Sequence, residues 1–141
     1  MKPAIVRYYF DTDILGLAKV IAALRPDVTY PGAPEQVVKN RLRPACEITS
    51  TDIADRIWIP MVAAAGMVAI TRDSKITRHP SERATVMDSN ARLFALHPDQ
   101  AVTVWSQLEL LMRQWRKIEY LVEQPGPYIY KISRSRVRQM F

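Results

Sequence analysis

The sequence is poor in the residues that cross-link small domains or bind zinc in them. It has one cysteine, Cys46, and two histidines, His79 and His97, among 141 residues. A single cysteine cannot close an internal disulfide, and no cluster of cysteine and histidine has the spacing of a zinc site. These absences exclude a disulfide-rich scaffold and a zinc module, and they suit a reducing compartment.

Long apolar runs are also missing. The opening apolar stretch is interrupted by Arg7, and nowhere do about 18 apolar residues follow one another, as a membrane helix requires. We therefore expect a cytoplasmic protein that is neither exported nor inserted in a membrane. With 48% hydrophobic residues, the chain is long enough for one compact domain with a core and too short for two.

Positive charge is concentrated toward the C-terminal end. The formal net charge is +6, and residues 113–141 contribute most of it, with seven basic residues against two glutamates. Such a segment attracts polyanions, above all RNA or DNA, through phosphate contacts and counterion release. A solvated surface, or an arm that docks on an acidic partner protein, explains the charge equally well. The candidates for nucleic-acid contact in this segment are Arg134, Arg136 and Arg138.

Strand and helix patterns alternate along the chain. β-Branched and apolar runs predict strands at residues 4–10, 28–30, 47–49, 67–71, 91–96 and 128–132. Helical periodicity and capping residues predict helices at 14–24, 35–41, 50–66, 80–89 and 101–122, with a kink or late restart at Pro60. This order predicts an α/β sandwich with a mostly parallel sheet. We place the domain at residues 1–124 and assign 125–141 to a basic C-terminal edge strand and tail of the same domain.

Five of the eight aspartates fall where one end of the predicted sheet gathers them. Asp11 and Asp13 follow the first strand, Asp73 follows the strand at 67–71, and Asp52 and Asp55 begin the preceding helix. In an open parallel sheet, ligands bind outside the carboxyl ends of the strands. Carboxylates that lie close together raise one another's pKa unless a divalent cation compensates.

Mg²⁺ or Mn²⁺ is the natural ion for such a cluster, because both are hard cations that take oxygen ligands and retain waters. A bound ion of this kind activates a water and stabilises a phosphodiester under attack. Two of the acids also have local explanations. Asp13 is placed to cap the helix that begins at Ile14, and Asp52 is placed to interact with a helix dipole.

Two basic residues flank the third strand-terminal acid. Arg72 precedes Asp73 directly, and Lys75 follows it by two positions. Both are candidates for contact with nucleic-acid phosphates. Ion pairing with the neighbouring acids explains them equally well.

The motifs that hold these acids are similar to a known family. The stretches "YYFDTDILGLAKVIAAL" and "TDIADRIWIPMVAAAGMVAITRDSKI" resemble the PIN-like domains, most closely the VapC45-type group related to toxin ribonucleases of toxin–antitoxin pairs. The specific part is the ordered set: a strand-terminal Asp11, a helix-start Asp55, and the Asp73 of "TRD" 18 residues later. The resemblance continues through "RLFAL" and "GPYIYKISRSR", so it covers most of the chain.

This resemblance implies a PIN-like three-layer α/β/α sandwich and a Mg²⁺- or Mn²⁺-dependent endoribonuclease. Asp11, Asp55 and Asp73 would be the catalytic, metal-binding acids, with Asp13 or Asp52 in support. The metal would position and deprotonate a water that attacks the RNA backbone and leaves a 5′-phosphate. An RNA substrate, a cognate antitoxin protein and a homodimer are the partners that the resemblance implies.

The sequence departs from the usual PIN pattern at two points. The customary helix-borne glutamate is absent, its role falling to Asp52 or Asp55, and no clear fourth acid follows "TRD", where Glu82 and Asp88 are the substitutes. The alternative is therefore a PIN-like module that binds nucleic acid or a partner with weak or no catalysis.

Overall fold

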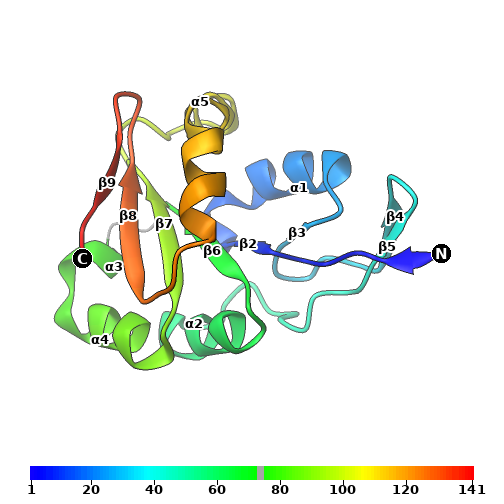
Figure 1. Cartoon of the computed structure of the whole chain (residues 1–141), viewed down its shortest axis with the longest axis horizontal. Coiled ribbons are helices and arrows are strands. Elements are labelled where there is room, and N and C mark those ends of the chain that lie inside the picture. Colours follow the sequence, from blue (N-terminus) through cyan, green and yellow to red (C-terminus); the bar gives the residue numbers. More distant parts are fainter. Residues whose placement is uncertain (73–74) are drawn as a thin grey trace.

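The computed structural model describes residues 1–72 and 75–141 and is built around a six-stranded sheet (Figure 1). The strands lie in the order β3-β2-β6-β7-β8-β9; all neighbours are parallel except β8 and β9. The prediction of an α/β fold with a mostly parallel central sheet is confirmed. The strand bounds are β3 Val28–Thr29, β2 Tyr8–Phe10, β6 Val68–Thr71, β7 Arg92–Leu96, β8 Tyr128–Ile132 and β9 Val137–Gln139.

Helices cover both faces of this sheet, which gives the expected three layers. On one face α1 (Leu15–Leu24) and α5 (Val104–Val122) pack in a core that includes Phe10 and Phe94. On the other face α2 (Asp55–Ala64) and α4 (Pro80–Ser89) pack in a second core that includes Tyr9. Successive strand residues therefore point alternately to the α1/α5 face and the α2/α4 face. None of the helices in the described ranges is long and apolar enough to cross a membrane.

Several predicted elements form as expected. The helix at 80–89 and the strand at 128–132 have the predicted bounds, and the strand at 67–71 becomes β6, whose four residues are all buried. The helix predicted from Ile14 is present as α1, after a short 3-10 helix η1 (Thr12–Ile14). The first strand is shorter than predicted, because pairing in the main sheet begins only at Tyr8.

The helix predicted at residues 35–41 is wrong. These residues form a hairpin of β4 (Gln36–Val38) and β5 (Arg41–Arg43), to which β1 (Lys2–Pro3) adds a parallel strand. The two residues between the strands, Lys39 and Asn40, have φ of 48° and 62°. Two consecutive positive φ values are those of a type I′ turn, whose twist suits a hairpin and is incompatible with a helix.

The start of α2 also differs from the prediction. The helix was expected to begin at a cap on Ser50 or Thr51, but it begins only at Asp55. Its N-cap residue is Ala54, which makes no side-chain hydrogen bond. It then continues to Ala64 without a break at Pro60, and ends before Gly66, whose φ is 75°. Residues 47–49 have no strand assignment in the described structure.

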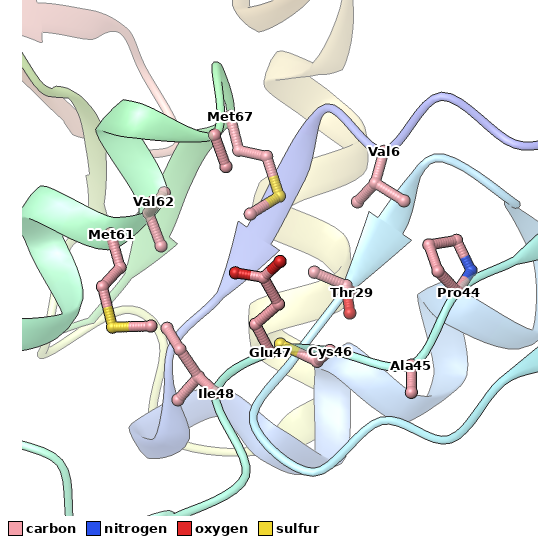
Figure 2. Close-up of a pocket in the computed structure, with 11 residues that line it drawn as sticks. Val6, Thr29, Pro44, Ala45, Cys46, Glu47, Ile48, Met61, Val62 and Met67 are labelled. Atoms are coloured by element: carbon pink, nitrogen blue, oxygen red, sulfur yellow. The ribbon is translucent and has the colours of Figure 1, made fainter.

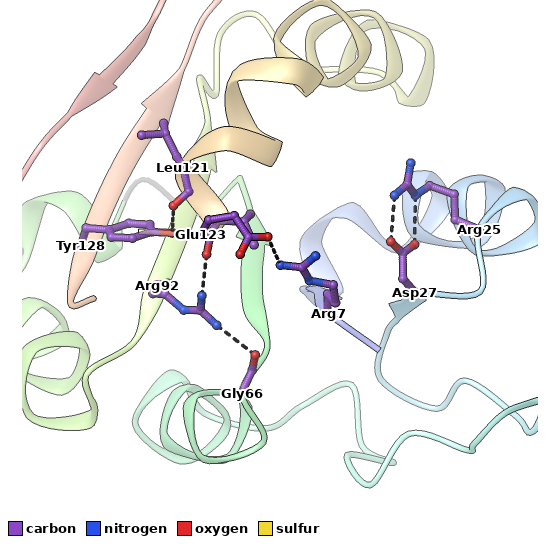
Figure 3. Close-up of polar contacts among 9 residues, drawn as sticks. Arg7, Arg25, Asp27, Gly66, Arg92, Leu121, Glu123 and Tyr128 are labelled. Carbon is purple, nitrogen blue, oxygen red and sulfur yellow. Dashed lines mark hydrogen bonds and ion pairs between the residues drawn. The ribbon is translucent and has the colours of Figure 1, made fainter. Parts of the chain in front are cut away.

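The C-terminal end of α5 is fastened to the sheet by polar contacts (Figure 3). The Arg92 guanidinium donates to the Val122 carbonyl at 2.7 Å and to the Gly66 carbonyl at 2.9 Å. The Tyr128 hydroxyl donates to the Leu121 carbonyl at 2.8 Å. These bonds satisfy carbonyls that a helix end leaves free, and they fix α5 against β7 and β8.

Candidate active site

Asp11 lies at the end of β2, where the chain leaves the sheet. Its backbone N–H still donates to the Ile70 carbonyl of β6 at 2.9 Å. Its carboxylate accepts hydrogen bonds from the Thr12 N–H at 2.7 Å and from the Thr71 hydroxyl at 3.1 Å. Only 7% of Asp11 is exposed. Two adjacent parallel strands therefore hold this buried carboxylate in one position.

Asp13 lies beside it and is exposed. Its carboxylate accepts from the Arg72 N–H at 3.2 Å and lies 3.4 Å from the Thr71 hydroxyl oxygen. A threonine hydroxyl carries one proton, so Thr71 donates to either Asp11 or Asp13 at any moment. The carboxyl ends of β2 and β6 thus bring two carboxylates to one hydroxyl.

The explanation of Asp13 as a helix N-cap is wrong. Asp11 is the residue that caps η1 through its side chain, and the N-cap position of α1, Ile14, has no side-chain hydrogen bond. Asp13 instead lies in the first turn of η1 and accepts a hydrogen bond from the Arg72 N–H.

The electrostatics of Asp11 are those of a crowded carboxylate. The pKa of Asp11 is raised from 3.8 to about 7, chiefly by burial and also by the charges of Asp13 and, more weakly, Asp55. The hydrogen bonds from Thr12 and Thr71 oppose the rise, since they favour the ionised form. A positive charge close to Asp11 would restore the ionised carboxylate at neutral pH.

Asp55 approaches this pair from α2, as the first residue of that helix. The Trp58 indole N–H donates to its carboxylate at 2.8 Å. Trp58 is itself buried and its ring lies 5.2 Å from that of Tyr9 in β2. Packing against the sheet therefore orients the indole, and the indole orients the carboxylate.

The remaining sequence candidates lie in different surroundings. Asp52 is exposed in the turn before α2, where its N–H donates to the Ser50 hydroxyl at 3.1 Å. Arg72 is half-buried, and its guanidinium donates to the Ala101 carbonyl at 3.1 Å. Asp73 lies outside the described residues. The other basic candidates are Lys75, which opens the short helix α3 (Lys75–Arg78), and Arg134, Arg136 and Arg138, which are exposed on the β8–β9 hairpin.

Sequence reasoning missed two side chains of this site. Thr71 hydrogen-bonds Asp11, and its place at a strand end, in "TRD", is the feature of the sequence that could have indicated this. Trp58 hydrogen-bonds Asp55, and the three-residue spacing that puts both residues on one face of a helix could have indicated that contact.

A divalent cation suits these side chains by their chemistry. Asp11 is buried beside like charges, and it forms no ion pair with any Lys or Arg whose side chain the structure describes. The donors are carboxylate oxygens, which Mg²⁺ and Mn²⁺ prefer. Among the described residues, no three His, Cys, Asp or Glu side chains converge closely enough to hold an ion.

An apolar hollow of about 210 Å³ lies at the opposite end of the strands (Figure 2). Val6 precedes β2 and Met67 precedes β6, so this hollow is at the amino ends. Glu47 is the only carboxylate among the described residues that line it, and the lining otherwise includes Cys46, Ile48 and Met61. It lacks the paired ionisable groups of a hydrolytic site, so the carboxyl end remains the candidate.

An α/β/α sandwich with aspartates beyond the ends of adjacent parallel strands defines the class of fold, and comparison with known families agrees. The family model described as "PIN like domain" matches residues 8–98. The chain therefore belongs to the PIN-like domain family. The match includes all five candidate aspartates and ends before α5, β8 and β9.

A relative from Mycobacterium tuberculosis (strain H37Rv) is described as "Putative ribonuclease VapC45". It is 30% identical over 91 residues, which are 64% of this chain and 65% of that protein. The similarity thus spans a little under two thirds of the relative's length. No solved structure gave a significant match.

Proposed function

We propose that this protein is a Mg²⁺- or Mn²⁺-dependent endoribonuclease and the toxin of a toxin–antitoxin pair. The observation that supports it best is the Asp11–Thr71–Asp13 arrangement, with Asp55 close enough to affect the pKa of Asp11. Membership of the PIN-like family and the similarity to a protein named as a ribonuclease support the same reaction class.

In this proposal Asp11, Asp55 and Asp73 hold the ion, and Asp13 and Asp52 support it. When bound, such an ion lowers the pKa of a coordinated water and offsets the charge of a phosphodiester. The protein's own part is positional. Thr71 and the Thr12 N–H fix Asp11. Trp58 fixes Asp55, and the Arg72 N–H fixes Asp13.

The substrate is RNA, cut by hydrolysis to leave a 5′-phosphate. We treat residues 1–124 and the basic segment 125–141 as one functional domain, because β8 pairs along its whole length with β7. Arg72, Lys75, Arg134, Arg136 and Arg138 are the proposed contacts with RNA phosphates. A cognate antitoxin and a second copy of the chain are the proposed protein partners, and the cytoplasm is the proposed location.

The direct test is to incubate the purified protein with a mixed RNA pool and Mg²⁺ or Mn²⁺. We expect cleavage that EDTA abolishes and that Asp73→Asn or Asp55→Asn reduces at least about 100-fold, since each removes a charged ligand. Glu35→Gln, a matched carboxylate-to-amide change at an exposed site, should cut at the wild-type rate. Circular dichroism establishes that each variant is folded.

Binding of Mn²⁺ gives a second readout. The nuclease proposal requires that the wild type bind Mn²⁺ and that Asp73→Asn weaken this binding. A folded, partner-free protein that neither binds Mn²⁺ nor cuts RNA would instead be a PIN-like module for binding nucleic acid or a partner.

A further inference from the structure

A polar hollow of about 260 Å³ lies at the carboxyl ends of β7 and β8. His97 follows the last residue of β7, and Ser133 follows the last residue of β8. The β8–β9 hairpin that carries most of the lining extends beyond the sheet beside α5 (Figure 1). The lining residues are His97, Gln100, Lys131, Ser133, Ser135, Arg136 and Arg138.

The charges of this hollow are unbalanced. Lys131, Arg136 and Arg138 line it, and no Asp or Glu among the residues that the structure describes does. Throughout the described chain, these three cations form no ion pair. Lys131 stands directly opposite Arg138 in the antiparallel β8–β9 register. Like charges at directly opposed positions destabilise a strand pair, so a bound anion between them would relieve the repulsion.

His97 adds a hydrogen-bonding ring nitrogen. The Asp99 backbone N–H donates to its Nδ1 at 3.2 Å, which leaves Nε2 as the ring nitrogen that can donate to a ligand. That Nε2–H makes no hydrogen bond within the residues the structure describes.

The turn beyond β8 is held in place before any ligand arrives. The Arg134 N–H donates to the Gln100 side-chain oxygen at 2.8 Å, and Gln114 of α5 donates to the Ser133 carbonyl at 2.8 Å. The Arg136 N–H donates to the Ser133 hydroxyl at 3.3 Å. A fixed backbone lowers the conformational entropy lost on binding.

The hollow and the candidate active site lie on the same face of the sheet. Tyr9, Ala69, Leu93 and Ile129 all belong to the core on the α2/α4 side of the sheet. Because strand side chains alternate, positions two or four residues further along point to that side as well. Those positions are Asp11, Thr71, His97 and Lys131. Three strand spacings separate β2 from β8 in the sheet, which amounts to about 14 Å.

We propose that this hollow binds a backbone phosphate of single-stranded RNA, at a nucleotide removed from the bond that Asp11 and its neighbours would cut. This proposal rests on the proposed ribonuclease function. Lys131 and Arg138 bind the phosphate oxygens, Arg136 closes the hollow, and His97 donates from Nε2. An RNA strand lying across one end of the sheet would meet both sites, because they share an edge and a face.

The test measures binding without cleavage. A fluorescent 12-nucleotide single-stranded RNA is titrated with the full-length protein in EDTA, from 50 to 300 mM salt. We expect Lys131→Ala with Arg138→Ala to weaken binding on the order of tenfold at low salt. The slope of log K against log salt should fall by about 0.7, since the double variant loses one phosphate contact and each such contact on a single strand contributes about 0.7.

Two matched variants locate the effect. Arg113→Ala with Arg116→Ala removes the same charge from an exposed part of α5 and should change the slope by less than about 0.3. His97→Ala should weaken binding, because it removes a hydrogen-bond donor to the phosphate. Equal losses in the two double variants, or no RNA binding by the wild type, would overturn the proposal.

Failure of the nuclease proposal and failure of the phosphate-site proposal would give different results. A protein without ribonuclease activity would still show the slope change in EDTA, where no cleavage occurs. If instead the wild type cuts RNA and the Lys131/Arg138 variant has the same KM and the same salt slope, the nuclease stands and the phosphate site falls. Loss of binding to an acidic protein partner alone, with RNA binding intact, would also overturn the phosphate site.

Discussion

Replacing Asp11 by asparagine should stabilise the metal-free protein at alkaline pH. Asp11 is almost fully buried and its pKa is raised from 3.8 to about 7. The folded protein therefore retains a proton on Asp11 up to about pH 7, whereas the unfolded chain releases it near pH 4. The folded state binds more protons between these values, so the free energy of unfolding falls as pH rises through this window.

The size of the effect follows from the same pKa difference. At 1.36 kcal/mol per pH unit, ionising Asp11 costs the folded state about 4 kcal/mol by pH 8. Asparagine has nearly the same shape and cannot ionise. Its side-chain oxygen can accept from the Thr12 N–H, and its amide can donate to the Thr71 hydroxyl, so both hydrogen bonds have replacements. Asp11→Asn should therefore raise Tm by roughly 10 °C at pH 8.

Thermal and urea unfolding in EDTA between pH 4 and 8 measures this. The wild type should lose stability as pH rises, Asp11→Asn should show a flatter profile, and the two should converge near pH 4, where Asp11 is protonated in the unfolded chain as well. Glu35→Gln should follow the wild type, because Glu35 is exposed. Mn²⁺ at 100 times its Kd should return about 2.7 kcal/mol to the wild type and little to Asp11→Asn. A variant that is less stable than the wild type at pH 8 in EDTA would refute the reasoning.

Two further substitutions test how the fold is held. Arg43 is fully buried and donates to the carbonyls of Ala22 and Val28. Arg43→Met leaves both carbonyls unpaired, so it should lower the free energy of unfolding in urea by about 3 kcal/mol. A loss below about 1 kcal/mol would contradict this. Thr103 forms a capping box with Ser106 at the start of α5. Thr103→Ala should therefore lower the free energy of unfolding by about 1 kcal/mol, whereas Thr103→Ser should keep most of that stability.

Elements with a local cause were predictable from the sequence. The helix at 80–89 matches its prediction because Pro80 occupies the first helical position and Asn90 ends the helix with a φ of 56°. β6 was predictable as a strand buried on both faces, since its residues form a continuous apolar run up to Thr71.

Elements decided by distant contacts were not predictable. The hairpin at residues 36–43 contains no glycine to mark its turn, and Arg43 enters the protein interior to reach α1 and β3. A buried arginine is rare enough that the sequence alone favours exposure. The proximity of Asp11 and Asp13 was predictable, because both follow the first strand of the main sheet. Which aspartate would be buried was not, because that depends on how Thr71 and Trp58 pack around them.

The carboxyl edge of the sheet carries acidic side chains at one end and basic side chains at the other. At β2 and β6 the edge carries Asp11 and Asp13, which repel both one another and an approaching polyanion. At β7 and β8 the same edge carries Lys131, whose positive charge attracts one, beside His97. The acidic half lies within the segment that matches the PIN-like family, whereas most of the basic half lies beyond it. A site for cutting RNA needs both halves, because acids that can hold a metal do not by themselves bring a phosphate backbone to it.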